Sequence, residues 1–247
     1  MKAIILAAGI GGRLGKYSNN KPKSLLEFNG KTLLKRHIEL LQIQNIDEII
    51  IVTGFKSKMI IEHLKDLTMP IHYILNKRYT EGSMLSLNCA REILQNEPEL
   101  ILMDADVLYD SKIIERLINT KIKNCFLLDR NFIDGDEPVK VCIDKNGKVN
   151  EFRKIISNEH KYDFQGESVG FFKFDNSIGK SLVSIIDNYI AIKKNEKPYE
   201  EVIRDSLLQF PEKFGFEDIS GIPWIEIDFP EDIERASKEI MPKLSKI

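Results

Sequence analysis

The chain has 247 residues, of which 43% are hydrophobic and 30% charged, an ordinary composition for a globular protein. Its formal net charge of −2 excludes a global basic field for holding nucleic acid or an anionic membrane, so we expect no nucleic-acid partner. No run of about 18 apolar residues occurs, and we therefore expect a cytoplasmic protein without membrane insertion.

The first half of the chain alternates strand and helix patterns. Short apolar runs predict strands at Lys2–Ala7, Glu48–Thr53, Ile71–Leu75, Leu100–Asp104 and Cys125–Asp129. Between them, apolar residues recur at helical spacing, as at Leu34, Ile38 and Leu41, and further helices are predicted over Ser83–Leu94 and Ser111–Asn119. This alternation predicts βαβ crossovers and a mostly parallel α/β sheet, whose ligands bind beyond the carboxyl ends of the strands.

The second half has a different pattern. Asn146-Gly147 lies between two strand candidates and is a strong hairpin signal. The predicted elements are strands at Val139–Ile143, Lys148–Ile155, Ser168–Phe174 and Trp224–Asp228, and helices at Ser177–Ile192, Tyr199–Phe210 and Pro230–Leu244. We interpret this half as a smaller mixed β/α portion that completes a site, within a single domain of residues 1–247.

A glycine-rich loop follows the first predicted strand directly. Gly9, Gly11 and Gly12 would let backbone N–H groups approach phosphate oxygens, and Arg13 adds a guanidinium fork. The dinucleotide pattern GxGxxG fails because its last position is Leu14, and the P-loop pattern fails as well. The loop therefore predicts phosphate binding of another kind.

The glycine loop and the segment after it carry a specific resemblance. The sequence KAIILAAGIGGRL, followed by KPKSLLEFNGKTLL, resembles the signature of the nucleotidyltransferases that make nucleotide sugars and CDP-alcohols. The resemblance implies a Rossmann-like sheet of the nucleotide-diphospho-sugar transferase (GT-A-like) type. It also implies an NTP-binding part in residues 1–130 and an acceptor-binding part in residues 131–247.

The resemblance implies three cationic side chains in catalysis. Arg13 would hold the β- and γ-phosphates of the NTP, and Lys23 would reach the α-phosphate. Lys154 matches a lysine that contacts the acceptor phosphate in the family, with Arg153 one residue away as the alternative. An acceptor phosphate is already an ionised nucleophile, so no serine, cysteine or histidine nucleophile is required.

Two predicted strands end in carboxylates. Alternation along the first strand would place Asp104 and Asp106 on one side, and Glu226 would share a face with Asp228 on the second. Mg²⁺ binds a few carboxylate oxygens together with substrate phosphates. In the family one aspartate from each such position binds this ion, so the resemblance implies Asp106 and Asp228 as ligands of a Mg²⁺ cofactor.

The segment before the predicted strand Leu100–Asp104 favours CTP as the nucleotide substrate. Asn76, followed by Ser83-x-x-Ser86-Leu87, is similar to the phosphocholine cytidylyltransferase branch and unlike the sugar-1-phosphate enzymes. The expected nucleotide-binding residues are Leu6, Ala7, Ala8, Gly9, Gly11, Gly12, Arg13, Lys23, Asn76, Gly82, Ser83 and Asp104.

The acceptor is narrowed to a small non-sugar phosphate or phosphonate. The same branch includes enzymes for phosphocholine, 2-aminoethylphosphonate, inositol phosphate and phosphoglutamine. A cationic acceptor calls for aromatic and acidic walls, for which the candidates are Glu167, Tyr199, Glu200, Glu201, Trp224 and Glu226. A carboxylate-bearing acceptor would instead use Arg130, Lys140 or Arg153. A homodimer is common among such enzymes, but the sequence does not demonstrate one.

Three alternatives stay open at this point. A sugar-1-phosphate nucleotidyltransferase using UTP or dTTP would share the chemistry. A GT-A-type glycosyltransferase would use Asp104-Ala105-Asp106 as a DxD metal motif, although it has no role for Arg13 and Lys23. A non-catalytic NTP-binding module would tolerate loss of Asp106.

Overall fold

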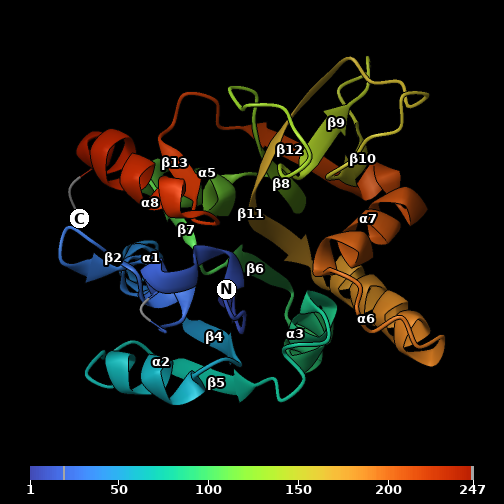
Figure 1. Cartoon of the computed structure of the whole chain (residues 1–247). Coiled ribbons are helices and arrows are strands. Elements are labelled where there is room, and N and C mark those ends of the chain that lie inside the picture. The colour runs from blue at the N-terminus through green and yellow to red at the C-terminus, as the bar shows by residue number, and fades with distance from the viewer. Residues whose placement is uncertain (19, 246–247) are drawn as a thin grey trace.

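The centre of the fold is a sheet whose first half is parallel. The computed structural model describes residues 1–18 and 20–245 and contains, within that part of the chain, a sheet of nine strands (Figure 1). Its parallel strands lie in the order β6-β1-β4-β5. Their bounds are β1 Lys2–Ala7, β4 Glu48–Thr53, β5 Ile71–Leu75 and β6 Glu99–Asp104, close to those predicted.

One long strand joins the parallel half to the second half. β11 (Phe164–Asp175) runs antiparallel to β6 and pairs further along its length with β8 (Asn124–Asp129) and β9 (Lys140–Ile143). The sheet continues through β10 (Val149–Arg153) and β12 (Phe214–Asp218). The hairpin predicted at Asn146-Gly147 is confirmed, since β9 and β10 are antiparallel neighbours and Gly147 has φ +75°.

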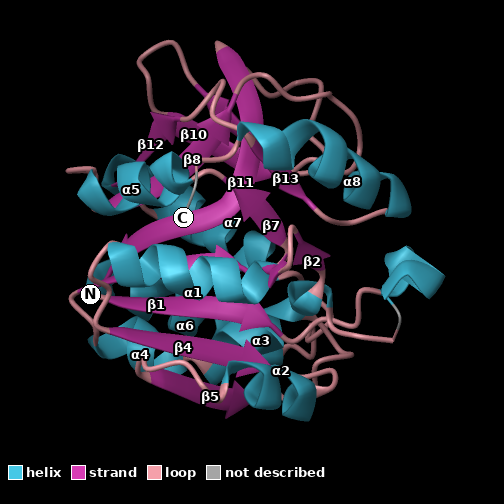
Figure 2. Ribbon diagram, turned by 90° about the vertical axis from the view of Figure 1, so that its left-hand side faces the viewer, coloured by secondary structure: helices cyan, strands magenta, loops and turns pink. Residues whose placement is uncertain are grey.

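Helices cover both faces of the sheet, and each face has its own apolar core. One face carries α1 (Leu33–Ile43), α2 (Ser57–Leu64) and α5 (Ser111–Asn119). The other carries α3 (Ser83–Cys89), α4 (Arg91–Asn96), α6 (Asn176–Ala191) and α7 (Tyr199–Gln209). Figure 2 shows α1 in front of β1 and β4, with α3, α4 and α6 behind them. The α/β class with a mostly parallel central sheet is confirmed.

Two predicted helices differ in the structure. The helix predicted over Ser83–Leu94 is two helices, because Ala90 closes a tighter turn by donating its N–H to the carbonyl of Leu87. The last helical segment is α only over α8 (Pro230–Arg235); a π turn (η4, Ala236–Ile240) and a 3₁₀ turn (η5, Met241–Lys243) follow. Pro242 lies in that last turn and has no N–H to continue an α-helical ladder.

Several short elements were not predicted. The strand predicted at Trp224–Asp228 is confirmed as β13 (Trp224–Glu226), but its antiparallel partner β7 (Val107–Tyr109) was not predicted, nor were β2 (Glu27–Phe28) and β3 (Lys31–Thr32), which pair with each other. Besides η5, the described residues include three 3₁₀ segments: η1 (Gly12–Ser18), η2 (Lys23–Leu25) and η3 (Pro211–Lys213). Among the described helices, none combines the length and the apolar character needed to cross a bilayer.

Candidate active site

The glycine loop forms one wall of a pocket at the carboxyl ends of β1 and β6. The pocket measures about 190 Å³ and is lined by Leu6, Ala7, Gly9, Gly11, Gly12, Arg13, Pro22, Lys23, Ser24, Ala105 and Asp106. Gly11 has φ +69°, and a Cβ there would lie 2.7 Å from Cγ of Lys23. Glycine at this position therefore allows the lysine stem to lie against the loop, which brings the ammonium to the acidic strand ends.

Two cations and two carboxylates meet at the rim of this pocket. Lys23 Nζ lies 3.1 Å from Asp106 Oδ2 and also contacts Asp228 Oδ1. Arg13 Nη2 lies 2.7 Å from Asp228 Oδ2. Burial alone would lower the pKa of the Lys23 ammonium, but Asp106 and Asp228 outweigh it and hold that pKa above its usual value. The lysine therefore stays charged throughout the neutral pH range.

The β7–β13 ladder brings the two acidic segments together. Val107 pairs with Glu226, so Asp106 lies beside the end of β13. Asp232, in the first turn of α8, accepts hydrogen bonds from the backbone N–H of Asp228 at 3.0 Å and of Phe229 at 2.7 Å, which fixes the backbone at Asp228. Without the β7–β13 ladder, Asp106 and Asp228 would not be held side by side.

The carboxylates are arranged as a candidate cation site. One carboxylate oxygen each from Asp106, Glu226 and Asp228 lie within 4.8 Å of one another. The Lys23 ammonium contacts two of these side chains, which shows that their negative charge is matched by a cation in the folded chain. Oxygen donors of this number and charge suit Mg²⁺, which keeps positions for substrate oxygens. The residues therefore fit the expected ion.

Asp104 lies at the end of β6, and its carboxylate bonds to Tyr199. The predicted alternation does not continue to Asp106 because β6 ends at Asp104. The carboxylate of Asp104 accepts a hydrogen bond from the Tyr199 hydroxyl at 2.5 Å. Tyr199 is buried by this contact and lies behind the site instead of on a pocket wall. The acceptor contact expected of Tyr199 stays a prediction.

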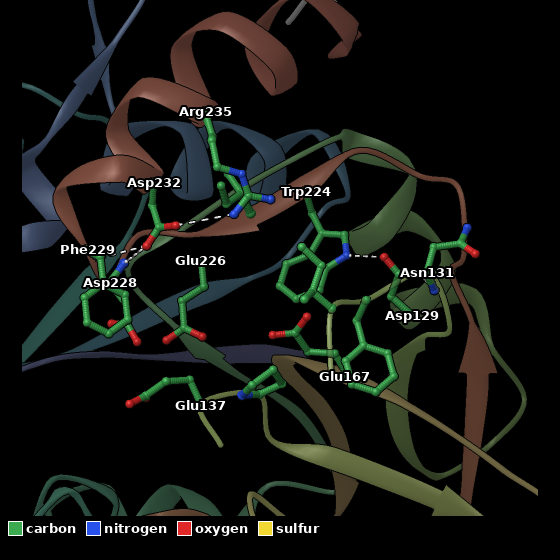
Figure 3. Close-up of a pocket in the computed structure, with 14 residues that line it drawn as sticks. Asp129, Asn131, Glu137, Glu167, Trp224, Glu226, Asp228, Phe229, Asp232 and Arg235 are labelled. Atoms are coloured by element: carbon green, nitrogen blue, oxygen red, sulfur yellow. Dashed lines mark hydrogen bonds and ion pairs between the residues drawn. The ribbon is translucent and has the colours of Figure 1, made fainter. Parts of the chain in front are cut away.

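A second pocket, on the other side of Asp228, is strongly acidic. It measures about 250 Å³ and is lined by Asp129, Asn131, Phe132, Ile133, Glu137, Pro138, Glu167, Trp224, Ile225, Glu226, Asp228, Phe229, Asp232 and Arg235. Figure 3 shows the carboxylates of Glu226 and Glu167 on either side of the space between them, with the Glu137 side chain below. Its one lining cation, Arg235, already lies 3.6 Å from Asp232. Glu137, Asp228 and Asp232 have cationic partners, whereas Asp129, Glu167 and Glu226 form no ion pair within the described residues.

The far end of the acidic pocket combines an aromatic ring with two carboxyl groups. The Trp224 indole N–H donates to Asp129 at 2.8 Å, which fixes the ring plane (Figure 3). Glu167 is the strand partner of Asp129 in the β11–β8 ladder. Burial, with the charge of Asp129, raises the pKa of Glu167 to about 7. A cation between these groups would relieve the repulsion that raises this pKa.

The other predicted nucleotide-binding residues lie apart from the glycine-loop pocket. Asn76 is buried, donates to Ser86 Oγ at 3.0 Å and accepts from the Arg78 N–H at 2.8 Å. A Cβ on Gly82 would lie 2.3 Å from a backbone oxygen, so close chain packing requires this glycine. Ser83 Oγ accepts from the Tyr199 N–H at 2.9 Å. These three residues hold the start of α3 in place, beyond the end of β5.

Three further predicted residues are engaged in ion pairs. Lys154 Nζ lies 3.1 Å from Glu137, and Arg153 forms two hydrogen bonds with Glu201 at 2.8 and 2.7 Å. Glu201 therefore belongs to a neighbouring surface and does not line the acidic pocket. Of the two candidate cations, Lys154 is the one that shares a partner with Arg13.

Sequence reasoning missed Glu137, Asp129 and Phe229. The Arg13 guanidinium lies over the Phe229 ring at 5.0 Å from its centroid, while its Nη1 contacts Glu137 at 2.8 Å. Phe229 stands next to the predicted ligand Asp228 and before the helix-opening Pro230, and that position was the only local signal. Glu137 and Asp129 had none, because their roles depend on which strands pair.

Comparison with known proteins identifies a family. Residues 3–128 match the model of the MobA-like NTP transferase domain. The CTP:phosphoglutamine cytidylyltransferase of Campylobacter jejuni is 27% identical over 252 residues, covering 95% of this chain and 98% of that protein. A bifunctional IPC transferase and DIPP synthase of Thermococcus kodakarensis is 28% identical over 97% of this chain, which spans 50% of its length. The solved CTP:phosphocholine cytidylyltransferase of Streptococcus pneumoniae has a TM-score of 0.73 at 21% identity, covering 96% of this chain and 97% of that one.

Proposed function

Because the chain belongs to the family of MobA-like NTP transferase domains and is a nucleotidyltransferase, we propose that it transfers CMP from CTP to a small non-sugar acceptor. The acceptor would carry a phosphate or phosphonate group, and pyrophosphate would be released. The observation that carries this proposal is the meeting of Arg13 and Lys23 with Asp106 and Asp228, between the glycine-loop pocket and the acidic pocket.

The two pockets support a division of the chain between the two substrates. Residues 1–130 would bind CTP, with its triphosphate in the glycine-loop pocket and its base toward Asn76, Gly82 and Ser83. Residues 131–247 would supply most of the acceptor site. The names of the similar proteins favour CTP over UTP or dTTP. The cytoplasmic location and the homodimer stay predictions.

The reaction needs alignment and charge neutralisation. An ionised oxygen of the acceptor attacks the α-phosphorus of CTP, one phosphorus–oxygen bond forms, and the bond to the bridging oxygen of the β-phosphate breaks. No proton has to be removed from the nucleophile. Arg13 and Lys23 would stabilise the charge on the leaving pyrophosphate, and Lys154 would bind the acceptor phosphate.

A bound Mg²⁺ would be held by Asp106 and Asp228, with Glu226 close by, and would offset phosphate charge in the transition state. The Lys23 ammonium now contacts both aspartates, so these side chains would share their charge between ion and lysine. The short contacts of Asp232 with the backbone at Asp228 keep one of the two carboxylates oriented.

The charge of the acidic pocket favours an acceptor with a positive group at the end opposite its phosphate. A neutral sugar would leave Asp129, Glu167 and Glu226 without a cationic partner, and a carboxylate-bearing acceptor would add a further negative charge. An ammonium group between Glu167 and Asp129 would also face the Trp224 ring, and such contacts stabilise cations by about 0.5–2 kcal/mol. We therefore favour phosphocholine-like or amino-phosphonate acceptors.

A nucleotide panel tests the reaction. The protein, with Mg²⁺ and each of CTP, UTP, GTP, ATP and dTTP, would be assayed for pyrophosphate release against a pool of small phosphates and phosphonates and against sugar 1-phosphates. Release with CTP and a non-sugar acceptor supports the proposal. Release only with UTP or dTTP and a sugar phosphate would contradict it.

A matched pair of acceptors tests the charge argument. Phosphocholine and its carbon isostere 3,3-dimethylbutyl phosphate have the same shape and differ in one positive charge. We expect kcat/KM to favour phosphocholine by roughly tenfold or more, since tenfold corresponds to about 1.4 kcal/mol. If the enzyme is active with both compounds and their kcat/KM values are equal, the acidic pocket does not select acceptors by their positive charge.

A further inference from the structure

One carboxylate connects the two cations that face the two substrates. Glu137 lies in the loop between β8 and β9. Its Oε2 is 2.8 Å from Arg13 Nη1 and 3.1 Å from Lys154 Nζ. Arg13 follows β1 and Lys154 follows β10, so these cations reach Glu137 from opposite halves of the molecule.

The base of this loop is held more firmly than the Glu137 side chain. Lys140 is buried, and its ammonium donates to the carbonyls of Gly135 at 2.5 Å and of Lys154 at 2.7 Å. These bonds fix the backbone on both sides of the contact. The side chains of Glu137, Arg13 and Lys154 are instead 56%, 45% and 43% exposed. Exposed ion pairs are weak, so Glu137 can be displaced without unfolding its loop.

We propose that Glu137 is an internal competitor for the substrate phosphates. In the substrate-free protein its carboxylate occupies the Arg13 and Lys154 donors that would bind phosphate oxygens, and this step rests on the proposed function. A triphosphate carries more charge than a carboxylate and offers several oxygens to the guanidinium fork, so it displaces Glu137. Glu137 keeps the two cations placed in the empty site, at a cost in substrate affinity.

Titration calorimetry of CTP binding tests this competition. We expect Glu137→Gln to lower the Kd for CTP by roughly three- to tenfold, because two weak ion pairs no longer oppose binding. Asp136→Asn is the matched control: it removes the same charge from the next residue, and within the described chain Asp136 has no ion pair or side-chain hydrogen bond. Its Kd should stay within about twofold of the original protein.

Comparing the two variants distinguishes competition by Glu137 from a general effect of removing one negative charge. An equal Kd for the original protein and Glu137→Gln overturns the proposal, and so does an equal gain in both variants. In turnover assays at saturating acceptor we expect Glu137→Gln to lower the KM for CTP. A matching loss of kcat would show that Glu137 places Arg13 for catalysis instead.

Inorganic pyrophosphate keeps this test apart from the identity of the nucleotide. If CTP does not bind but pyrophosphate binds more tightly to Glu137→Gln, the competition stands and the choice of CTP fails. If neither anion binds to any variant, the cations do not hold phosphate, and both proposals fall. A thermal melt of each variant would confirm that the exposed substitutions leave the fold intact.

Discussion

His37 makes the fold sensitive to acid. Its ring is fully buried in α1, stacked on Tyr109 with centroids 5.1 Å apart and in edge contact with Phe171 at 5.8 Å. Burial, reinforced by the charge of Arg36, lowers the pKa of His37 to about 3. In the unfolded chain the pKa of a histidine is about 6.5. Over the pH range between these two pKa values, the native state therefore keeps the ring neutral, whereas the unfolded chain takes up a proton at this residue.

The sign and size of the effect follow from linkage. The stabilising contribution is fully present above about pH 6.5 and is lost as the pH falls toward 3, because only the unfolded state gains a proton there. At pH 5 the unfolded histidine lies about 1.5 pH units below its pKa, which corresponds to a loss of about 2 kcal/mol. We expect His37→Phe to keep the ring contacts and to remove this loss.

Urea unfolding at pH 7.5, 6.0 and 5.0, followed by circular dichroism, measures the effect. Between the two extremes the free energy of unfolding of the original protein should fall by about 2 kcal/mol more than that of His37→Phe. His72→Gln is the control, because the His72 side chain is 67% exposed, and we expect it to follow the original protein. A parallel pH dependence for the original protein and His37→Phe would refute the reasoning.

Three further predictions concern the candidate site. Asp228→Asn should lower kcat on the order of 100-fold, since it removes a carboxylate from the proposed ion and from Arg13 and Lys23; an unchanged kcat at saturating Mg²⁺ would contradict its role. Gly170→Ala should destabilise the fold by about 1–3 kcal/mol in urea unfolding, because φ is +76° and the new Cβ would lie 2.3 Å from Asp104 Oδ2. The pKa of Glu167, about 7, predicts that the KM for a cationic acceptor rises as the pH falls from 8 to 6, and Glu167→Gln should flatten that rise; a rise of equal size in the variant would point to the acceptor phosphate instead.

The parallel half of the fold could be predicted because its signals are local. The stripe of Leu34, Ile38 and Leu41 is fully buried on one face of α1, as its spacing indicated. Gly11 and its neighbours after β1 line a pocket, as expected of a glycine loop at the carboxyl end of a strand. In these segments the spacing of apolar residues and the turn residues that predict each element lie close together in the sequence.

The rest of the site depends on contacts that no local pattern encodes. The strand β13 was predicted, but its partner β7 has three residues, too few for a clear alternation, and the pairing of the two was not indicated. The hydrogen bond from the Tyr199 hydroxyl to Asp104 joins a helix start to a distant strand end, which no local pattern indicates. Glu137 had no signal, since its partners lie in the segments that follow β1 and β10. The roles assigned to individual residues in binding and catalysis stay predictions.

The β7–β13 ladder also determines the stage of folding at which the site can form. Lys23 and Asp228, which meet through it, are 205 positions apart in the sequence. Closing so large a loop is entropically costly, and such contacts form slowly compared with helices and neighbouring strands. We expect a refolding chain to regain helical dichroism first and turnover last. Enzymatic activity would then report the final step of folding, and a chain that stops short of residue 228 would hold the glycine loop but not the completed acidic centre.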